Sequence, residues 1–505
     1  MKTGGELHQR LIRNARRLSA PEYRAPQIFA EGREWPGDWQ GRTMLALCSL
    51  YRGLNEEDPE RKAVFGQLRE ILEALPQHCN RDGYFGEPFD GRVVNEQQVS
   101  GNSWFLRGLC EAYRLTGDEK ILERLDSISR NFLIPLGAFY DDYPLQPREM
   151  GGVGGHLQAG VTGRWRLSSD VGCAFMMLDG ITQTCKLLND AELKKTAARM
   201  IEAFSGLDVV GCRCQTHATL SATRGILRFY GMTGEVRYLT LAERMFARYL
   251  EEGSTVNYAN FNWFGRPDSW TEPCAVVDSL ILALKLFGET GKPDYLRLVN
   301  RIYANALLPA QRINGGAGCE TCLSRDQRIL KIHLYEAYFC CSMRLAEGLY
   351  ELTRAQRIGE KDPVIGFWNE FESGEGAQKI SLSVREEGED CGVLICRPPK
   401  SGFRLYVPEG CKIRCEHPFE RSECFLIFSG GLPEKLEIRY QLEPFSAERK
   451  GRKVYFLGDR LLTEKNGGTA EEGYRMFADG RKLTPLANCF RLPDKGAELA
   501  LRQKI

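Results

Sequence analysis

Two short motifs contain side chains that could bind one metal ion. Cys340 and Cys341 are neighbours in Tyr-Phe-Cys-Cys-Ser-Met-Arg, and adjacent thiols cannot easily form a disulfide with each other. Glu272 and Cys274 stand in the sequence Thr-Glu-Pro-Cys-Ala. Both motifs open segments with helical periodicity, and one carboxylate with three thiolates forms a tetrahedral donor set that zinc accepts. The sequence therefore predicts a zinc site made of these four residues.

A second arrangement uses other cysteines. Glu320 and Cys322 form another Glu-x-Cys motif, and Cys319 precedes it directly. Cys319 and Cys322, followed by the double cysteine, have a spacing that would also suit a structural zinc site with four thiols. The residues alone leave both ligand sets open.

The first ligand set resembles that of the β-L-arabinofuranosidase family, glycoside hydrolase family 127 and its relatives. Members of that family carry Glu-x-Cys at the start of a helix and a Cys-Cys pair one helical hairpin later, and all four side chains bind zinc. The motif at Glu272 meets this condition, whereas the motif at Glu320 does not. The resemblance extends loosely over residues 35–355. It implies zinc as the cofactor and a glycoside or oligosaccharide as the substrate.

The resemblance also implies a role for one thiol, because in that family the first cysteine of the pair attacks the anomeric carbon. Cys340 is then the expected nucleophile, and zinc would favour its thiolate, which is the reactive form. A retaining displacement also needs a carboxylic acid about 5 Å away across the sugar. The family's acid/base glutamate lies just before the Glu-x-Cys motif, but residues 255–263 contain no carboxylate. The candidates come from elsewhere in the chain, first Glu320 and Asp170, then Glu252 and Asp268.

Side chains that could contact a sugar lie mainly in predicted loops. The segment Thr-His-Ala at residues 216–218 resembles a substrate-contacting histidine segment of the same family. Aromatic side chains in loops, rather than on helical stripes, suit the apolar faces of sugar rings. The candidates for substrate binding are His217, Trp165, Tyr258, Trp263 and Trp270.

A repeated turn indicates how these residues are positioned. A helical segment ends at Thr-Gly and a new one follows, which is typical of a helical hairpin. Clear copies of this turn occur at residues 113–118, 230–235 and 287–291, and weaker ones near Asn55, Asn189 and Thr353. The repeat predicts six helical hairpins between about residues 40 and 355.

Six hairpins that close on themselves make an (α/α)6 barrel, in which the loops at one end form the cleft. Long loops on a compact scaffold often carry function. The long loops here are 81–103, 140–170, 253–273 and 310–335.

The pattern changes after Lys379 to a period of two, as in Ile380, Leu382 and Val384, which predicts strands. The expected fold is mainly α, an (α/α)6 barrel followed by an all-β sandwich. We expect the barrel domain at 1–356, a linker at 357–379 and the β-sandwich at 380–505.

Composition narrows the function. The 505 residues include 68 basic and 67 acidic side chains, so no strong field favours nucleic acid or an anionic membrane as a partner. The N-terminus has no unbroken apolar stretch, and the 18 cysteines do not frame a small secreted scaffold, so we expect a cytoplasmic protein.

The function that these observations favour is a retaining glycoside hydrolase that acts on a terminal sugar through a zinc-bound cysteine. Two alternatives stay open. One is a lyase or epimerase on the same barrel, with His217, Tyr258 or Asp170 as acid or base. The other is a non-catalytic sugar-binding protein in which zinc only braces the loops. The sugar, its linkage and the oligomeric state are not encoded in any motif.

Overall fold

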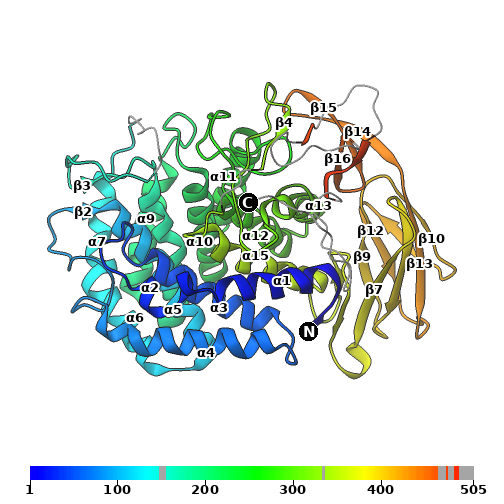
Figure 1. Ribbon diagram of the computed structural model, residues 1–505, viewed down its shortest axis with the longest axis horizontal. Coiled ribbons are helices and arrows are strands. Elements are labelled where there is room, and N and C mark those ends of the chain that lie inside the picture. Colours follow the sequence, from blue (N-terminus) through cyan, green and yellow to red (C-terminus); the bar gives the residue numbers. More distant parts are fainter. Residues whose placement is uncertain (147–154, 333–335, 465–473, 476–482, 488–505) are drawn as a thin grey trace.

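The computed structural model describes residues 1–146, 155–332, 336–464, 474–475 and 483–487. In this structure the first part of the chain forms a ring of helices. Within these residues, six helices form an inner ring: α3 (Asp38–Gly53), α5 (Glu96–Thr116), α8 (Met177–Leu188), α10 (Thr216–Thr233), α12 (Pro273–Thr290) and α15 (Cys341–Gln356). Each contacts the next, and α15 returns to α3, so the ring is closed. The predicted (α/α)6 barrel is confirmed (Figure 1).

A second layer of helices covers the inner ring. Its members in the described residues are α1 (Gly5–Leu18), α4 (Pro59–Ala74), α6 (Glu119–Ile128), α9 (Ala191–Ser205), α11 (Val236–Arg248) and α13 (Pro293–Ile302). The short helices α2 (Ala25–Ile28), α7 (Ile134–Leu136) and α14 (Leu308–Ala310) lie in the connections. Inner helices are buried on most faces, whereas an outer helix such as α13 buries only Leu296, Val299 and Ile302, at a spacing of three residues.

Left-handed residues end the inner helices and turn the chain into the outer layer. Gly117, Gly234 and Gly291 have φ values of 67°, 70° and 69°, and Asn189 has a φ of 54°. Each donates its N–H to a carbonyl four residues back, and the outer helix begins within two residues. This is the turn that the sequence repeat predicts.

The sixth hairpin differs from the sequence expectation. The turn expected near Thr353 is absent from this described segment, because α15 continues to Gln356 and the chain then enters the β region. The outer helix that packs against α15 is α1, which buries Leu7, Leu11 and Leu18 on one face. The barrel is therefore closed by the two ends of its own sequence.

Glycines allow neighbouring inner helices to approach closely. A Cβ on Gly41 of α3 would lie 2.1 Å from the backbone nitrogen of Phe105 in α5. A Cβ on Gly225 of α10 would lie 2.3 Å from the carbonyl oxygen of Leu178 in α8. Since real atoms do not approach so closely, glycine is required at both crossings.

The β region contains two sheets that share one apolar core. The first has the strand order β1 (Lys2–Thr3), β6 (Phe371–Ser373), β7 (Ile380–Glu386), β8 (Cys391–Arg397), β13 (Leu436–Leu442), β10 (Cys411–Arg414). The second has the order β11 (Glu420–Ser422), β12 (Phe425–Phe428), β9 (Phe403–Tyr406), β5 (Val364–Ile365). Leu382 and Ile438 from the first sheet pack with Leu405 and Leu426 from the second. A C-terminal β-sheet region is thus confirmed.

The segment 357–379 is more structured than the expected linker, since it contains β5 and β6, which join one sheet each. These strands are two and three residues long, too short for a period of two to stand out in the sequence. The placement of the domain boundaries stays a prediction. Parts of the predicted loops 140–170 and 310–335 and of the predicted domain 380–505 lie outside the described residues.

The last strands return to the barrel. A further sheet has the order β14 (Pro444–Arg449), β15 (Arg452–Leu457), β16 (Arg460–Glu464), β18 (Leu483–Pro485), and β17 (Tyr474–Arg475) pairs with β4 (Ile329–Leu330). Arg449 donates to the carbonyl of Val256 in a barrel loop. A short parallel pair, β2 (Val94–Asn95) with β3 (Trp165–Arg166), joins two other barrel loops. No helix in the described part of the chain has the length and apolar character to span a bilayer.

Candidate metal centre and active site

The four candidate metal ligands meet at the N-terminal ends of two neighbouring inner helices. Glu272 is the N-cap residue of α12 and Cys274 lies in its first turn, while Cys340 and Cys341 are the N-cap and first residues of α15. Their ligand atoms all lie within 4.8 Å of one another. The Sγ of Cys341 is 3.6 Å from the Sγ of Cys274 and 3.4 Å from the Sγ of Cys340. The first predicted ligand set is therefore brought together.

The geometry of this cluster fits zinc. A tetrahedral site with Zn–S bonds of about 2.3 Å separates its sulfur atoms by about 3.8 Å, close to the two sulfur distances here. The Oε2 atom of Glu272 is buried and has no hydrogen-bond partner in the described structure. A buried carboxylate oxygen without a partner is costly, and a metal ion would satisfy it.

The alternative site with four thiols is not formed. Cys322 directs its Sγ to the carbonyl oxygen of Asn260 at 3.4 Å, and its nearest hydroxyl is that of Ser269 at 4.0 Å. Among the described residues, Cys322 is not part of the ligand cluster. Cys319 is buried and lines a cavity above the cluster, but Cys322, the second cysteine of its motif, does not line that cavity.

The cluster needs a positive charge to hold thiolates. Burial raises the pKa of Cys274 well above that of an ordinary thiol, and burial also raises the pKa of Glu272. Two features near the cluster supply positive charge, the N-termini of two helices and one guanidinium group. The N-termini of α12 and α15 point at the cluster, and Arg42 of α3 places Nη1 3.6 Å from the Sγ of Cys274.

Arg42 is held in place from several sides. Its Nε donates to both carboxylate oxygens of Asp38 at 2.8 Å, and its guanidinium lies 4.0 Å from the centre of the Trp104 ring. Its Nη2 is 3.3 Å from Nε2 of His217. Because a guanidinium can only donate, Nε2 of His217 accepts this hydrogen bond.

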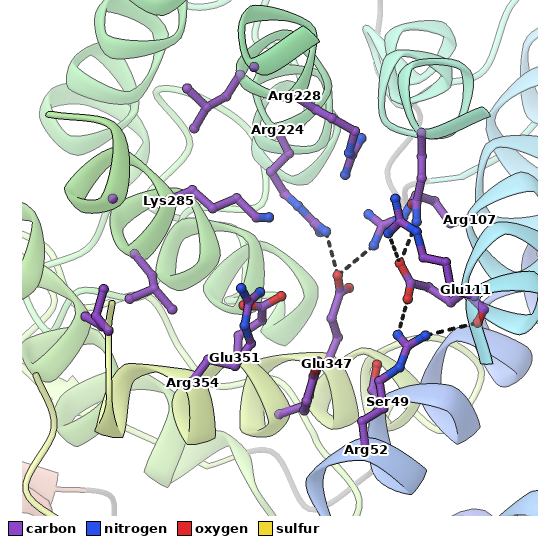
Figure 2. Close-up of a pocket in the computed structure, with 18 of the residues that line it drawn as sticks. Ser49, Arg52, Arg107, Glu111, Arg224, Arg228, Lys285, Glu347, Glu351 and Arg354 are labelled. Atoms are coloured by element: carbon purple, nitrogen blue, oxygen red, sulfur yellow. Dashed lines mark hydrogen bonds and ion pairs between the residues drawn. The ribbon is translucent and has the colours of Figure 1, made fainter. Parts of the chain in front are cut away.

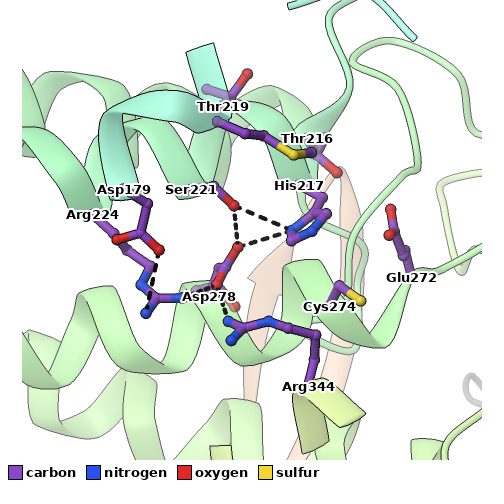
Figure 3. A network of polar contacts seen from close by, with 12 residues as sticks. Asp179, Thr216, His217, Thr219, Ser221, Arg224, Glu272, Cys274, Asp278 and Arg344 are labelled. Atoms are coloured by element: carbon purple, nitrogen blue, oxygen red, sulfur yellow. Dashed lines mark hydrogen bonds and ion pairs between the residues drawn. The ribbon is translucent and has the colours of Figure 1, made fainter. Parts of the chain in front are cut away.

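His217 is oriented by a buried carboxylate. Its Nδ1 is 2.9 Å from Oδ2 of Asp278, which also accepts from the hydroxyl of Ser221 at 2.8 Å (Figure 3). Nδ1 therefore carries the proton and Nε2 the lone pair. Arg224 and Arg344 each donate to Oδ1 of Asp278 at 2.5 Å. Burial alone would raise the pKa of Asp278, but these two arginines hold it well below its ordinary value.

A cavity of about 540 Å³ opens above the cluster. Of the four ligand residues, only Cys340 is not fully buried. The cavity is lined by polar residues, among them Gln215, His217 and Asn262, and by the aromatic residues Trp35, Trp270 and Phe339. Phe339 is 51% exposed and directly precedes Cys340 in the chain. Such a mixture of aromatic and polar walls is typical of small-molecule sites.

Asp170 is the acid/base candidate that lines this cavity. The indole Nε1 of Trp263 donates to its Oδ1 at 3.0 Å, and Nε2 of Gln215 donates to its Oδ2 at 3.4 Å. Gln215 and Trp263 face each other across an isolated β-bridge, so both donors are fixed by the backbone. Burial raises the pKa of Asp170 to about 6. Its carboxyl group can therefore both give and take a proton near neutral pH.

The other candidate carboxylates lie away from the cavity lining. Glu320 is buried in an ion pair with Arg312 at 2.9 Å and accepts from the hydroxyl of Thr271 at 2.9 Å, which is a structural arrangement. Asp268 is mostly exposed and pairs with Arg266. Glu252 lies in the turn after α11. Asp170 is thus the candidate that the geometry favours.

The predicted sugar-contacting residues fall into three groups. His217 and Trp270 line the cavity, and Trp263 lies behind it, with its ring edge-on to Trp270 at a centroid distance of 5.1 Å. Trp165 is fully buried beside Tyr140 and donates to the carbonyl of Phe139, so it belongs to the core. Tyr258 lies under the guanidinium of Arg449, 3.7 Å from its ring centre, and is buried against the C-terminal sheet. Trp165 and Tyr258 cannot contact a ligand in this cavity.

Sequence reasoning missed several residues of the cavity lining, Gln215 and Asn262 among them. Asp38 and Arg42 form an ion pair one helical turn apart at the start of α3, and that spacing is visible in the sequence. Phe339 stands next to the double cysteine and could have been included on that ground. Trp35 has a φ of 59°, which is a strained conformation for a residue other than glycine. No sequence pattern predicts it, and such strain is often found at functional sites.

Comparisons with known proteins agree with this geometry. A family model described as β-L-arabinofuranosidase, GH127 catalytic domain, matches residues 208–354, a segment that includes His217 and the four ligand residues. No curated protein matches the sequence.

Solved structures are similar over most of the chain. One, described as a glycoside hydrolase, is 12% identical with a TM-score of 0.64 and covers 93% of this chain and 83% of its own. A GH127 β-arabinofuranosidase is 12% identical with a TM-score of 0.65 and covers 92% and 84%. A GH127 β-L-arabinofuranosidase from Geobacillus stearothermophilus T6 is 11% identical with a TM-score of 0.59 and covers 92% and 82%. At these identities the likeness establishes the fold.

Proposed function

We propose that this chain, a divergent relative of the GH127 β-L-arabinofuranosidase family, is a retaining glycoside hydrolase that removes a terminal sugar with Cys340 as its nucleophile. The observation that carries the proposal is the convergence of one glutamate and three cysteines at the wall of a cavity, with Cys340 as the partly exposed residue of the four. A purely structural zinc site would have no reason to lie at the wall of a substrate-sized cavity.

In the first step, the Sγ of Cys340 attacks the anomeric carbon of the terminal sugar, and the bond from that carbon to the leaving oxygen breaks. Asp170, protonated at the start, gives its proton to the leaving oxygen. The product of this step is a thioglycosyl bond to Cys340 and a released alcohol. The pKa of about 6 at Asp170 keeps a useful fraction of the acid form near neutral pH.

In the second step, the ionised Asp170 takes a proton from a water molecule, whose oxygen attacks the same carbon. The carbon–sulfur bond breaks, and the thiolate of Cys340 leaves. Two displacements on opposite faces retain the configuration at the anomeric carbon. Both steps use groups that line one cavity.

Glu272, Cys274, Cys340 and Cys341 would hold the zinc ion, whose positive charge would keep Cys340 a thiolate at neutral pH. The remaining residues position the chemistry. Asp278 fixes His217, and Nε2 of His217 in turn orients Arg42, whose remaining N–H groups at the cavity wall can donate to sugar hydroxyl groups.

The cavity volume suits a terminal sugar with part of its leaving group rather than a polymer lying across an open groove. Phe339 and Trp270 offer aromatic faces for sugar rings on either portion of the substrate. β-L-Arabinofuranosides are the first substrates to test, because the family model carries that description.

The decisive experiment combines metal analysis with trapping of the covalent intermediate. The native protein should contain one zinc ion per chain, and a slow aryl glycoside should add one glycosyl mass to the peptide that holds Cys340. Cys340→Ser should abolish both turnover and labelling. Cys391→Ser, at a partly exposed thiol in the β region, is the matched control and should leave both unchanged. Full turnover by Cys340→Ser on the same substrate would refute the nucleophile.

A further inference from the structure

A second large cavity lies at the other end of the barrel. It has a volume of about 760 Å³ and is lined by residues from the C-terminal halves of all the inner-ring helices (Figure 2). The cavity above the zinc ligands is lined instead by residues near the N-terminal ends of these helices, such as Arg42, His217 and Cys341. The two cavities are therefore separated along the barrel axis.

The walls of this second cavity carry an excess of positive charge. Its lining in the described residues contains nine lysine and arginine side chains: Arg52, Arg107, Arg114, Lys186, Arg224, Arg228, Lys285, Arg354 and Arg357. It contains four carboxylates: Glu111, Glu289, Glu347 and Glu351. Two buried acids behind the wall, Asp179 and Asp278, pair with Arg107, Arg224 and Arg228. The cations outnumber the acids even when these two are included.

The lining acids that point inward are already engaged. Glu347 accepts from Arg107 at 2.8 Å and from Arg224 at 2.6 Å on the floor of the cavity. Glu111 pairs with Arg52 and Arg114 at one wall. Glu351 pairs with Arg354 at 3.1 Å, and Glu289 is exposed at the mouth. Glu289, which is exposed to solvent, is thus the one of these four carboxylates without an ion pair in the described structure, and Lys186, Lys285 and Arg357 have no carboxylate partner there.

Lys285 shows this shortage of negative charge most clearly. Its side chain extends into the cavity in Figure 2, and within the described residues it makes no hydrogen bond or ion pair. Burial lowers the pKa of Lys285 to about 8; the negative charge of Glu351 opposes this shift, whereas Arg228 and Arg224 add to it. Burial likewise lowers the pKa of Arg228 to about 10. An anion in the cavity would reverse both effects.

The helix C-termini account for part of this arrangement, because each carries about half a negative charge and favours cations nearby. Those charges reside on backbone carbonyls at the helix ends. They leave the space between the guanidinium groups unfilled, and they give Lys285 no hydrogen-bond acceptor. A ligand with several acceptor oxygens would occupy this space and accept a hydrogen bond from Lys285.

We propose that this cavity is a binding site for a small phosphate-bearing anion, at the end of the barrel away from Cys340. Guanidinium groups converge on it from several helices, and their planar pairs of N–H donors match phosphate oxygens. The volume exceeds that of inorganic phosphate, so the phosphoryl group of a small organic ester would fit as well. This site does not depend on the proposed hydrolase activity.

The floor of this cavity is connected to the zinc end through hydrogen bonds. Arg224 donates both to Glu347 in the cavity floor and to Asp278, and Asp278 holds His217. An anion that accepts a hydrogen bond from Arg224 would therefore change the hydrogen-bond network that positions His217.

The test is titration calorimetry of the whole zinc-loaded protein at neutral pH and fixed ionic strength, with inorganic phosphate in one arm and glycerol 3-phosphate in the other. Glycerol alone is the neutral control. We expect saturable binding of at least one phosphate compound and a higher unfolding temperature in its presence. Tighter binding of the ester would indicate an organic phosphate, and equal binding would indicate that the bare phosphoryl group is recognised.

Lys285→Gln should weaken the binding about tenfold, since it removes one charge-assisted hydrogen bond. Its folding should be unaffected, because Lys285 has no partner in the described structure. Lys62→Gln, on the exposed side of α4, is the control and should bind as the native protein does. Arg354→Gln provides a second test at the cavity wall. Absence of saturable binding to either compound, or unchanged affinity in both cavity variants, would overturn the proposal.

Discussion

Replacing Asp170 by asparagine tests the proposed acid/base, because the change keeps the shape of the side chain and removes its proton. Asp170 lines the cavity with Cys340, and burial raises its pKa to about 6. General acid catalysis contributes about 10²- to 10⁴-fold in rate. We expect Asp170→Asn to lose that factor in kcat/KM on a substrate with a sugar leaving group.

The loss should depend on the leaving group. An aryl leaving group of low pKa departs without a proton, so the first step of the variant should be nearly normal with such a substrate. The second step would then be slow, because no base activates water, and the thioglycosyl enzyme should accumulate. An added nucleophile such as azide, which needs no base, should restore turnover. In the native protein, kcat/KM should fall as pH rises through about 6, and the variant should lack this limb.

The same substitution should raise stability. The pKa of Asp170 rises from 3.8 to about 6 on folding, so the folded state binds the proton more tightly than the unfolded state. The resulting loss of stability develops as pH rises from about 4 to about 6 and stays constant above. At about 1.4 kcal/mol for each pKa unit, it amounts to about 3 kcal/mol. Asp170→Asn should therefore be more stable than the native protein by up to about 3 kcal/mol at neutral pH, and equal to it in acid.

Glu320→Gln is the matched control for both measurements. Glu320 is also a buried carboxyl group whose pKa is raised by burial, but it pairs with Arg312 away from the cavity lining. Its replacement should lower stability, because it removes the negative charge that compensates the buried guanidinium of Arg312. Denaturant unfolding across the pH range and steady-state kinetics with the two leaving groups give the readouts. An Asp170→Asn variant with normal activity on the sugar leaving group and an unchanged pH profile would refute the assignment.

Three further predictions follow from the same geometry. Glu272→Gln should reduce zinc affinity by at least about tenfold in a chelator competition assay, because it removes a direct ligand whose Oε2 has no other partner in the described structure; unchanged affinity would exclude Glu272 as a ligand. Asp278→Asn should lower the free energy of unfolding by about 3–5 kcal/mol, since Arg224 and Arg344 would lose the negative charge of Asp278 that compensates their buried charges; a loss below about 1 kcal/mol in denaturant unfolding would contradict this. Phe339→Ala should raise KM about three- to tenfold for a substrate with a sugar leaving group and leave kcat nearly unchanged, because its exposed ring offers a stacking face without touching the reaction; an equal loss in kcat would place it in the chemical step.

The parts of the fold that the sequence predicts are those encoded locally. The repeated Thr-Gly turn ends a helix at Gly117, Gly234 and Gly291, because glycine adopts the left-handed conformation there without a steric penalty. The metal ligands share this property, since Glu272 and Cys340 each stand at the start of a helix. A short motif and a helix boundary were enough to group them.

Features that depend on distant parts of the chain were not predictable. Nothing near α1 shows that this helix completes a hairpin with α15, because that pairing depends on how the ring closes. Glu272 and Glu320 stand in similar motifs, and only the position of Arg312 explains why Glu320 is a structural group. Trp165 likewise looks like a loop aromatic until Tyr140 and Tyr143 enclose it.

The inner helices all run in the same direction, so their dipoles give the two ends of the barrel opposite partial charges. Their N-termini meet at the cluster of Cys274 and Cys341, where partial positive charges favour thiolates, and their C-termini meet at the cavity lined by Lys285 and Arg228. Between them, Asp278 and its arginines form a buried layer of compensated charge. A barrel with alternating inner helices would supply neither end with a uniform field. The parallel arrangement therefore favours the proposed thiolate at one end of the barrel and the cluster of cations at the other.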